Sequence, residues 1–270
     1  MDDNKNKVAI ITGSSRGIGK AVAVLFAKKG YSIVLNGRNK ERLLLAEKEV
    51  LKIHKRVFFV CCDVSKKEGG EKLITSALKT FKRIDVLINN VGVSSRGFFA
   101  DLSFDVFKSV FYSNVFGSIS PTIPAIPELR KTRGSVVFVS SLAGIRGLPF
   151  LSPYSSSKMS LRALAESLRV EEKRNGIHVG LVMVGVTEIE HNKEALSADG
   201  SVVILKSRKN RRVQKMSFVA EKIYKNVKKR RFISTLTTLG KINAFLTAIS
   251  PLFVEKIIEK KLHTFIEKSK

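Results

Sequence analysis

The sequence has 270 residues, of which 44% are hydrophobic and 27% are charged, values that fit a folded soluble protein and exclude a disordered chain. Its 49 lysines and arginines exceed its 23 aspartates and glutamates and give a net charge of +26. Such an excess attracts anionic surfaces, either nucleic acid or acidic phospholipid headgroups. No nucleic-acid-binding module is recognisable, so we expect nucleic acid not to be a partner.

Residues 1–7 are polar, and the apolar run that follows them, 8–11, is too short for a secretory signal or a membrane span. The most membrane-like stretch, 232–254, is interrupted by glycine, lysine, asparagine and proline, so a span is not expected there either. Cys61 and Cys62 are adjacent, which suits a reducing compartment better than a structural disulfide. We therefore expect a cytoplasmic protein.

Basic residues are concentrated in the segment 206–231. They are Lys206, Arg208, Lys209, Arg211, Arg212, Lys215, Lys222, Lys225, Lys228, Lys229, Arg230 and Arg231. This segment is a candidate contact for an anionic membrane surface, which would make the protein peripherally membrane-associated. The alternative is a solvated basic face.

The first predicted element is a β-branched strand at 7–11, followed by a glycine-rich stretch at 12–19 and a helical pattern at 21–29. Backbone N–H groups and the helix dipole at such a helix start attract an anion, and the glycines let the backbone approach a pyrophosphate. The arrangement predicts a dinucleotide-binding turn.

The next strand, 32–35, ends in Asn36, Gly37 and Arg38. Sites selective for NAD usually place a carboxylate here to bind the ribose hydroxyls, whereas an arginine can neutralise a 2′-phosphate. Arg38, helped by Arg16 in the glycine-rich turn, therefore favours NADP(H). The alternative is an arginine that merely starts the next helix.

Helices at 41–54 and 73–81 alternate with strands at 57–62 and 84–88, which is typical of a parallel sheet with helices on both faces. Asp63 follows the first of these strands, and we expect it to cap the next segment or to accept a hydrogen bond from an adenine amino group. The second strand leads into a polar Asn-Asn-Val-Gly tip at the carboxyl end of the sheet, where open α/β folds bind ligands.

The helix predicted at 104–117 carries Asn114, whose amide either is solvated or is needed inward. Three prolines, Pro121, Pro124 and Pro127, then predict a break or kink in any helix that continues toward residue 130.

A strand at 134–139 leads through Ser140 and Ser141 into a helix at 153–174 that carries Tyr154 and Lys158. Side chains four residues apart share one face of a helix, and a neighbouring ammonium favours phenolate over phenol. The tyrosine is therefore a candidate proton donor and acceptor, and a serine at the strand end can hydrogen-bond a substrate oxygen. The alternative is a surface helix that happens to carry both residues.

Strands are predicted at 177–184 and 231–235, with a helix at 218–229 and two further helices at 241–250 and 252–268. Gly185, Val186 and Thr187 are placed to close over a bound cofactor. Segment 188–217 shows no clear element beyond a short helix at 193–198, and loops of this length often act as substrate lids.

These elements predict one α/β domain over 1–270. It is a doubly wound parallel sheet of about seven strands with helices on both faces. A basic loop and lid occupy about 188–217, and a C-terminal helical extension occupies about 236–270.

With these motifs assembled, the sequence resembles a short-chain dehydrogenase/reductase of the main type, which implies a Rossmann fold and NADP(H)-dependent chemistry. Thr12 to Gly19 matches the Thr-Gly-x-x-x-Gly-x-Gly turn, and residues 89–92 match Asn-Asn-Ala-Gly with Val91 replacing alanine. The resemblance implies that the cofactor contacts are Gly13, Ser15, Arg16, Gly17, Ile18, Gly19, Arg38, Asp63, Val64, Asn90, Val91, Gly92, Tyr154, Lys158, Gly185 and Thr187.

The same resemblance implies a catalytic tetrad of Asn114, Ser141, Tyr154 and Lys158. Tyr154 would exchange a proton with the substrate oxygen that Ser141 polarises. Lys158 would acidify the phenol and bind the nicotinamide ribose, and Asn114 would hold a water linking Lys158 to solvent. Ser141 is preferred over Ser140 because it has the spacing of the family.

One departure from the family is Val184-Gly185 where Pro-Gly is common, which predicts a looser or differently shaped cofactor lid. The basic segment and C-terminal helices resemble those of reductases for lipid-like ketones, so we expect a 3-ketosphinganine-like or steroid-like ketone as substrate. The alternatives are a 3-oxoacyl reductase for acyl thioesters and a non-catalytic dinucleotide-binding regulator. Family analogy implies a homodimer or homotetramer, and the four scattered histidines do not suggest a metal site.

Overall fold

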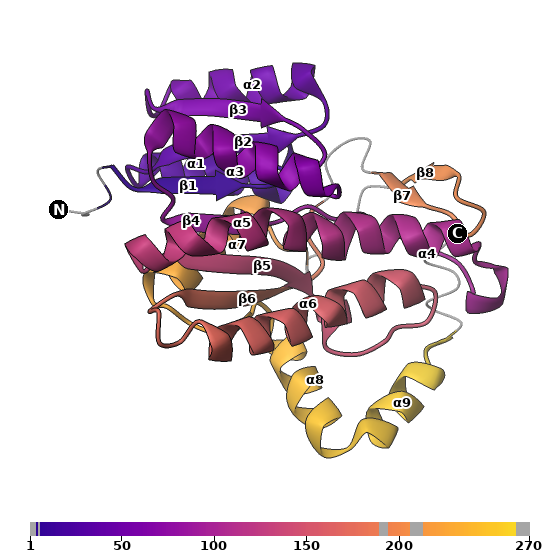
Figure 1. Cartoon of the computed structure of the whole chain (residues 1–270). Helices are drawn as coiled ribbons and strands as arrows, with labels where there is room; N and C mark the ends of the chain where they lie inside the picture. Colours follow the sequence, from indigo (N-terminus) through magenta and orange to yellow (C-terminus); the bar gives the residue numbers. More distant parts are fainter. Residues whose placement is uncertain (1–3, 5, 189–193, 206–212, 263–270) are drawn as a thin grey trace.

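A seven-stranded parallel sheet forms the centre of the computed structural model, which describes residues 4, 6–188, 194–205 and 213–262 (Figure 1). The strand order is β3-β2-β1-β4-β5-β6-β9. The strands are β1 (Val8–Ile11), β2 (Ser32–Gly37), β3 (Val57–Cys61), β4 (Val86–Asn89), β5 (Ser135–Ser141), β6 (His178–Val184) and β9 (Ile233–Thr235). The predicted doubly wound sheet of about seven strands is confirmed.

Helices cover both faces of this sheet. One face carries α1 (Gly17–Lys28), α2 (Lys40–Leu51) and α7 (Met216–Lys228), and the other carries α3 (Lys67–Phe81), α5 (Gly117–Thr132) and α6 (Ser152–Glu171). Helix α4 (Phe104–Phe111) packs against α6. The central strands are continuous apolar runs because a sheet covered on both sides buries every residue of its strands.

The predicted break at the three prolines is wrong, because α5 is one continuous helix that contains Pro121, Pro124 and Pro127. The helix packs along α3 and buries Pro121 and Ala125. Burial of this face outweighs the unfavourable helix propensity of proline.

The helix expected at 193–198 is also wrong: β7 (Glu194–Leu196) pairs antiparallel with β8 (Val202–Ile204), and residue 193 lies outside the described residues. A turn between the two strands explains the hairpin. Gly200 has a φ of +92°, and the Asp199 carboxylate accepts hydrogen bonds from the backbone N–H and hydroxyl of Ser201. This local turn chemistry overrides the helical pattern.

Two helices follow β9 and extend away from the body of the protein as a V (Figure 1). They are α8 (Thr238–Ile249) and α9 (Pro251–Glu259), as predicted on either side of Pro251, although part of the predicted second helix lies outside the described residues. Within 213–262 and the other described ranges, no helix is both long and apolar enough to cross a bilayer.

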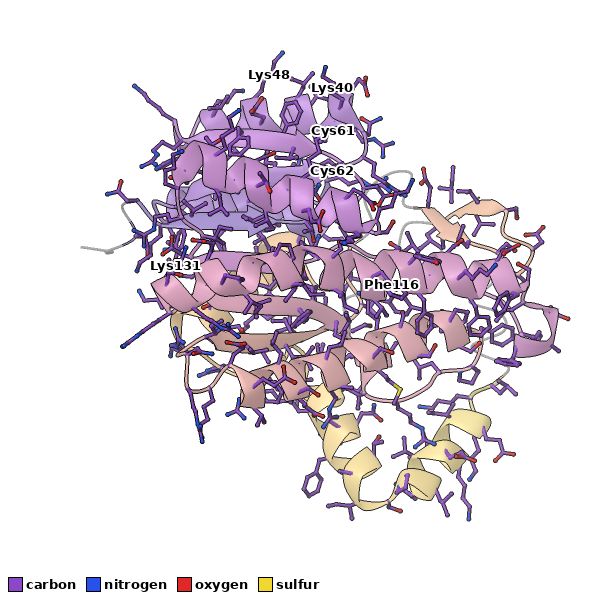
Figure 2. The ribbon with its side chains drawn as sticks, viewed as in Figure 1. Lys40, Lys48, Cys61, Cys62, Phe116 and Lys131 are labelled. Carbon is purple, nitrogen blue, oxygen red and sulfur yellow. The ribbon has the colours of Figure 1, made fainter. Side chains whose placement is uncertain are left out.

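The adjacent cysteines lie where β3 ends, near its carboxyl edge (Figure 2). Both are free thiols, so the expectation that they form no disulfide is confirmed. Burial raises the pKa of Cys62 to about 11, which keeps this thiol protonated at neutral pH.

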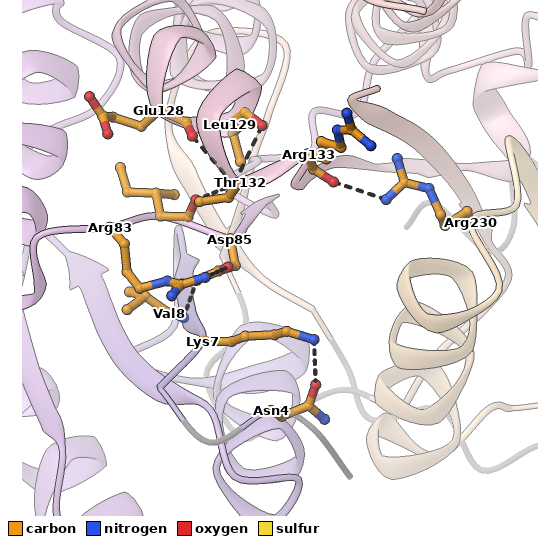
Figure 3. A network of polar contacts seen from close by, with 11 residues as sticks. Asn4, Lys7, Val8, Arg83, Asp85, Glu128, Leu129, Thr132, Arg133 and Arg230 are labelled. Atoms are coloured by element: carbon orange, nitrogen blue, oxygen red, sulfur yellow. Dashed lines mark hydrogen bonds and ion pairs between the residues drawn. The ribbon is translucent and has the colours of Figure 1, made fainter. Parts of the chain in front are cut away.

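A buried carboxylate ties the start of β1 to β4 at the edge of the sheet opposite these strand ends (Figure 3). The Val8 backbone N–H donates to Asp85 Oδ2 at 2.8 Å. The Arg83 guanidinium donates to both Asp85 oxygens, at 2.9 and 2.6 Å. The Asp85 N–H in turn donates to the Val8 carbonyl at 3.0 Å, so one residue closes the first pairing of the two central strands.

We expect Asp85→Ala to lower the free energy of unfolding by about 2 to 4 kcal/mol, because it leaves the Val8 N–H buried without its acceptor and Arg83 without its carboxylate. Glu71→Ala, which removes an exposed ion pair with Lys67, should change the free energy of unfolding by less than about 0.5 kcal/mol. Urea unfolding of the three proteins tests this. Equal midpoints for Asp85→Ala and the parent protein would contradict it.

Candidate active site

The candidate active site lies at the carboxyl edge of the sheet, where β1, β4, β5 and β6 end next to one another. The register places Ile11 beside Ile88 and Ser141 beside Val184. The segments that follow these four strands hold the glycine-rich turn, the Asn-Asn-Val-Gly tip, Ser141 and Gly185. The sequence motifs therefore meet at one edge, as the topology of a parallel sheet requires.

The glycine-rich turn between β1 and α1 is held by its own polar side chains. The Ser14 hydroxyl donates to the Ile11 carbonyl at 2.8 Å, and the Ser14 N–H donates to Asn36 in β2 at 2.9 Å. Gly13 and Gly17 have φ values of +62° and +61°, in the left-handed region that side chains disfavour. The turn thus needs glycine at both positions.

Asn90 and Thr12 join this turn to the tip after β4. Asn90 Nδ2 donates to the carbonyls of Thr12 and Gly13 at 3.1 and 3.3 Å, and its N–H donates to Thr12 Oγ1 at 2.9 Å. A Cβ on Gly19 would lie 2.6 Å from Asn90 Nδ2, so the third glycine of the turn leaves room for this amide. Asn90 was predicted as a cofactor contact, and here its side chain supports the cradle itself.

Lys158 is buried, and its ammonium is bonded to the strand that leads to the site. Its Nζ donates to the Val139 carbonyl at 3.0 Å and lies 5.9 Å from the centre of the half-buried Tyr154 ring. The predicted placement of the ammonium beside the phenol on one face of α6 is therefore present in the structure.

The two serines at the end of β5 have different surroundings. Ser140 is buried, and its hydroxyl donates to the Lys158 carbonyl at 3.0 Å. Ser141 is half-buried, and its hydroxyl accepts from the Ala143 N–H at 3.2 Å, which leaves its proton available to another acceptor. This geometry favours Ser141 as the group that meets a substrate.

Asn114 points inward, which answers the alternative left open by the sequence. It lies in a π-helical turn, Tyr112–Phe116, that joins α4 to α5. Its Oδ1 accepts from the Val93 N–H at 2.7 Å, and its Nδ2 donates to the Val93 carbonyl and to Ser157 Oγ at 3.0 and 2.8 Å. The water-holding role stays a prediction.

Gly92 separates Asn114 from Lys158, a role that the sequence motif alone did not reveal. A Cβ at this position would lie 3.0 Å from Asn114 Oδ1 and 3.1 Å from Lys158 Nζ. The absence of a side chain thus allows the amide and the ammonium to approach the tip from two different helices.

Charged side chains lie at the far end of the groove, near β2 and β3. Arg38 is 72% exposed along its side chain and lies 3.9 Å from Asp63 Oδ2. Asp63 Oδ1 accepts from the Ser65 N–H at 3.0 Å and its hydroxyl at 2.8 Å, which closes a turn before α3. The predicted capping role is wrong, because the N-cap of α3 is Lys66 and no side chain caps the helix. Arg16 lies 3.9 Å from Glu194 of β7, a partner that sequence reasoning missed because it lies far along the chain.

The segment after β6 is held by Gln214, which the sequence analysis did not identify. Gln214 Oε1 accepts from the Gly185 N–H at 3.2 Å, and Nε2 donates to the Leu236 carbonyl at 3.0 Å. A β-bridge pairs Gln214 with Thr187. The segment that lacks the usual proline is therefore tied to the end of β9 by a side-chain amide.

The glycine-rich turn, the tip after β4 and the segments that follow β2 and β3 line a groove with a volume of about 720 Å³, whereas Asn114 and Ser141 are not among its lining residues. Most predicted cofactor contacts line it. They are Gly13, Ser15, Arg16, Gly17, Ile18, Arg38, Asp63, Val64, Asn90, Val91, Gly92 and Thr187. Gly19, Tyr154, Lys158 and Gly185 are not among its lining residues, and Asn36, Cys62 and Glu194 line it without having been predicted.

Comparison with known proteins places the chain in a family. Residues 7–200 match the family model described as short chain dehydrogenase. The chain belongs to the short-chain dehydrogenase family. The resemblance inferred from the motifs is thereby confirmed, and with it a family of oxidoreductases.

Two relatives from Bos taurus illustrate the range of this family. Dehydrogenase/reductase SDR family member 7B is 36% identical over 73% of this chain and 63% of its own length. 3-Ketodihydrosphingosine reductase is 38% identical over 63% of this chain and 53% of its own length. The matches span less than two thirds of the length of these two relatives.

Solved structures of dehydrogenases share the fold. An alcohol dehydrogenase from the archaeon Thermococcus sibiricus, complexed with 5-hydroxy-NADP, has a TM-score of 0.75 at 26% identity and covers 85% of this chain and 95% of its own. A short-chain dehydrogenase/reductase from Burkholderia phymatum, in complex with NAD, has a TM-score of 0.81 at 22% identity. The match covers 94% of this chain and 96% of that protein. Both neighbours carry a nicotinamide dinucleotide, one of each type.

We expect Gly92→Ala to lower kcat for dinucleotide-dependent turnover by about 10-fold, because a methyl group there would force Asn114 and Lys158 to shift by a few tenths of an ångström. Gly147→Ala is the matched control, since nothing lies within 4 Å of its added Cβ. Steady-state kinetics and thermal unfolding of both variants test this. Equal kcat for the two variants would contradict the positioning role of Gly92.

Proposed function

We propose that this chain is an NADP(H)-dependent oxidoreductase that interconverts a ketone and a secondary alcohol. The observation that carries the proposal is the buried ammonium of Lys158, which the Val139 carbonyl holds beside the Tyr154 ring. Ser141 lies at the end of the same strand as Val139. A proton donor, an ammonium and a hydroxyl are the groups that reduction of a carbonyl needs, and this edge of the sheet carries all three.

The residues at this edge fit a dinucleotide. The glycine turn adopts left-handed backbone at Gly13 and Gly17, and α1 begins at Gly17, where the N-terminal end of a helix favours a pyrophosphate. Added side-chain atoms at Gly19 would collide with the turn. The cradle therefore has the shape that a phosphate group needs for close approach to the backbone.

The bound nicotinamide supplies or accepts the hydride. In the reducing direction, Tyr154 donates its phenolic proton to the substrate oxygen while the carbonyl carbon gains the hydride, so that one C–H and one O–H bond form and the C=O π bond breaks. The Lys158 ammonium stabilises the phenolate that remains. The Ser141 hydroxyl donates to the substrate oxygen as charge develops on it. Asn114 lies next to Gly92, and we assign to it the role of holding the water through which the site is reprotonated.

The exposed arginine beside Asp63 supports NADP(H) as the preferred dinucleotide. Arg38 follows β2 at the position where a carboxylate would bind the ribose hydroxyls of NAD, and its side chain is 72% exposed, with the guanidinium 3.9 Å from Asp63 Oδ2. Arg16 stands in the glycine turn at the same end of the groove. Two cations at this end suit a 2′-phosphate.

An apolar, lipid-like ketone is the proposed substrate class. The loop that joins Ser141 to Tyr154 carries Leu148, Phe150 and Leu151, and the Phe150 ring packs on Phe98 with 4.0 Å between ring centres. Apolar side chains therefore flank the candidate catalytic groups. The name of one relative, 3-ketodihydrosphingosine reductase, supports the same class.

We expect Tyr154→Phe to lower kcat with NADPH by at least about 1,000-fold, because phenylalanine has no hydroxyl proton to donate to the substrate oxygen. NADPH binding, measured by calorimetry, should change little. The assay follows NADPH consumption against steroid, sphingoid, acyl and sugar ketones. Ser160→Ala on the same helix is the control and should keep parent activity, whereas full activity of Tyr154→Phe would overturn the assigned chemistry.

We expect Arg38→Ala to weaken NADPH binding by about 10- to 100-fold and NADH binding by less than about 3-fold, since only NADPH carries the phosphate that a guanidinium binds. Arg56→Ala, which removes a cation just before β3 at the opposite end of the sheet, should alter neither. Calorimetric titration of parent and variants with NADPH and with NADH measures how much each substitution changes the two dissociation constants. An equal loss for NADH would exclude phosphate recognition by Arg38.

A further inference from the structure

The two C-terminal helices expose an unusual amount of apolar surface. A helix of a water-soluble protein normally buries its apolar face and presents a polar one to solvent. On α8 and α9 seven exposed side chains are instead large and apolar: Leu239, Ile242, Phe245, Ile249, Leu252, Phe253 and Ile257. Three of them, Ile249, Leu252 and Phe253, lie where α8 ends and α9 begins, which is the point of the V in Figure 1.

The point of the V combines apolar exposure with an absence of charge. Residues 242–254 contain no charged side chain. At the junction itself, Ile249 is 65% exposed, Leu252 is 71% exposed and Phe253 is 52% exposed. We call these three residues the hairpin tip.

Lysines flank the uncharged stretch on both sides. Lys241 precedes it on α8, and Lys256 follows it on α9, with Lys260 and Lys261 one turn further along; all four are exposed. The whole chain carries a net charge of +26. Glu255 and Glu259 are also exposed on α9, and Glu255 pairs with Arg146, so positive charge exceeds negative charge on both arms of the V, further from the hairpin tip.

We propose that the hairpin tip inserts into the interface of an anionic lipid bilayer, with the four lysines at the level of the headgroups. A bilayer offers an apolar interior beneath a layer of negative charge, and the tip and its lysines have the matching order of apolar and basic groups. A second copy of this chain would instead bring four more lysines against these four. The charge pattern therefore favours lipid as the occupant.

The hairpin is also attached to the loop at the candidate active site. The Arg146 guanidinium donates to the Pro251 carbonyl at 2.7 Å and to the Glu255 carboxylate at 3.0 Å. Gly240 of α8 lies against the Leu142 side chain, with no room for a Cβ. Both anchors lie between Ser141 and Tyr154, so a docked hairpin would hold this loop close to the bilayer.

The first experiment measures sedimentation of the full chain with vesicles of phosphatidylcholine containing about one third phosphatidylserine, and with pure phosphatidylcholine. We expect binding to the anionic vesicles, and a loss of at least about 10-fold in partition coefficient for the double variant Leu252→Ser with Phe253→Ser. The matched control is Leu45→Ser, which removes an equally exposed leucine from α2 and should bind like the parent protein. Thermal unfolding and dinucleotide binding confirm that each variant is folded.

A second experiment uses the absence of tryptophan from the chain. Phe253→Trp places a single fluorophore in the hairpin tip, and its emission should shift to shorter wavelength when anionic vesicles are added. Leu45→Trp should show no shift. This readout is independent of catalysis.

Three results would overturn the proposal. The first is that the parent protein does not bind anionic vesicles. The second is that the double variant binds them as well as the parent does, a result that would assign binding to the basic segment 206–231 alone. The third is a dimeric parent protein and a monomeric double variant in ultracentrifugation. In that case the emission of Phe253→Trp would shift with protein concentration and not with added lipid. That result would make a second copy of the chain the occupant.

Discussion

The bond between the Lys158 ammonium and the Val139 carbonyl is the contact on which the candidate site depends. It joins α6 to β5 two residues before Ser141, so the strand end and the helix face are placed relative to each other. A second bond, from the Ser140 hydroxyl to the Lys158 carbonyl, locks the same helix turn to the same strand. A buried ammonium is costly without acceptors, and the Val139 carbonyl, one residue past the last pairing of β5 with β4, supplies one.

Small residues around this bond make the approach of the two elements feasible. Gly144 lies against the Lys158 carbonyl, where a Cβ would be 2.8 Å from the oxygen, and Gly92 leaves room for the ammonium on its other side. The candidate catalytic residues Asn114 and Lys158 thus lie where two glycines allow three segments to come closer than side chains would permit. The carbonyl and the ammonium of Lys158 thus take part both in the packing of α6 and in the candidate site.

Much of this architecture was predictable because its strands are apolar runs that end in motifs. A strand buried on both faces, such as β1, has a sequence that is recognisable without its neighbours, and parallel topology then brings the ends of such strands together. The same local reasoning failed for Pro121 and its two neighbours, since the packing of α5 on α3 is not visible in α5 alone. It failed for β7 because the Asp199-Gly200 turn dominates a short segment.

The missed site residues share a different property, which is that each acts through a distant segment. Gln214 reaches Gly185 and Leu236 from a loop that has no motif of its own. Glu194 meets Arg16 only because β7 is laid beside residues 94–96, where the Leu196 N–H donates to Ser94 and its carbonyl accepts from Arg96. Spacing along the chain carries no information about such pairs, whereas spacing within one helix was enough for Tyr154 and Lys158.

The C-terminal extension is joined to the site at two points, Leu236 before α8 and Pro251 at the start of α9. Gln214 binds the Leu236 carbonyl just before α8 and the Gly185 N–H just after β6. Arg146 binds the start of α9 from the loop that precedes Tyr154. A movement of the hairpin would therefore be coupled both to the segment that follows β6 and to the loop that precedes Tyr154. A hairpin resting on a lipid surface would in this way hold both walls of the candidate site in a defined relation to that surface, which suits a reductase whose substrate arrives from the lipid phase.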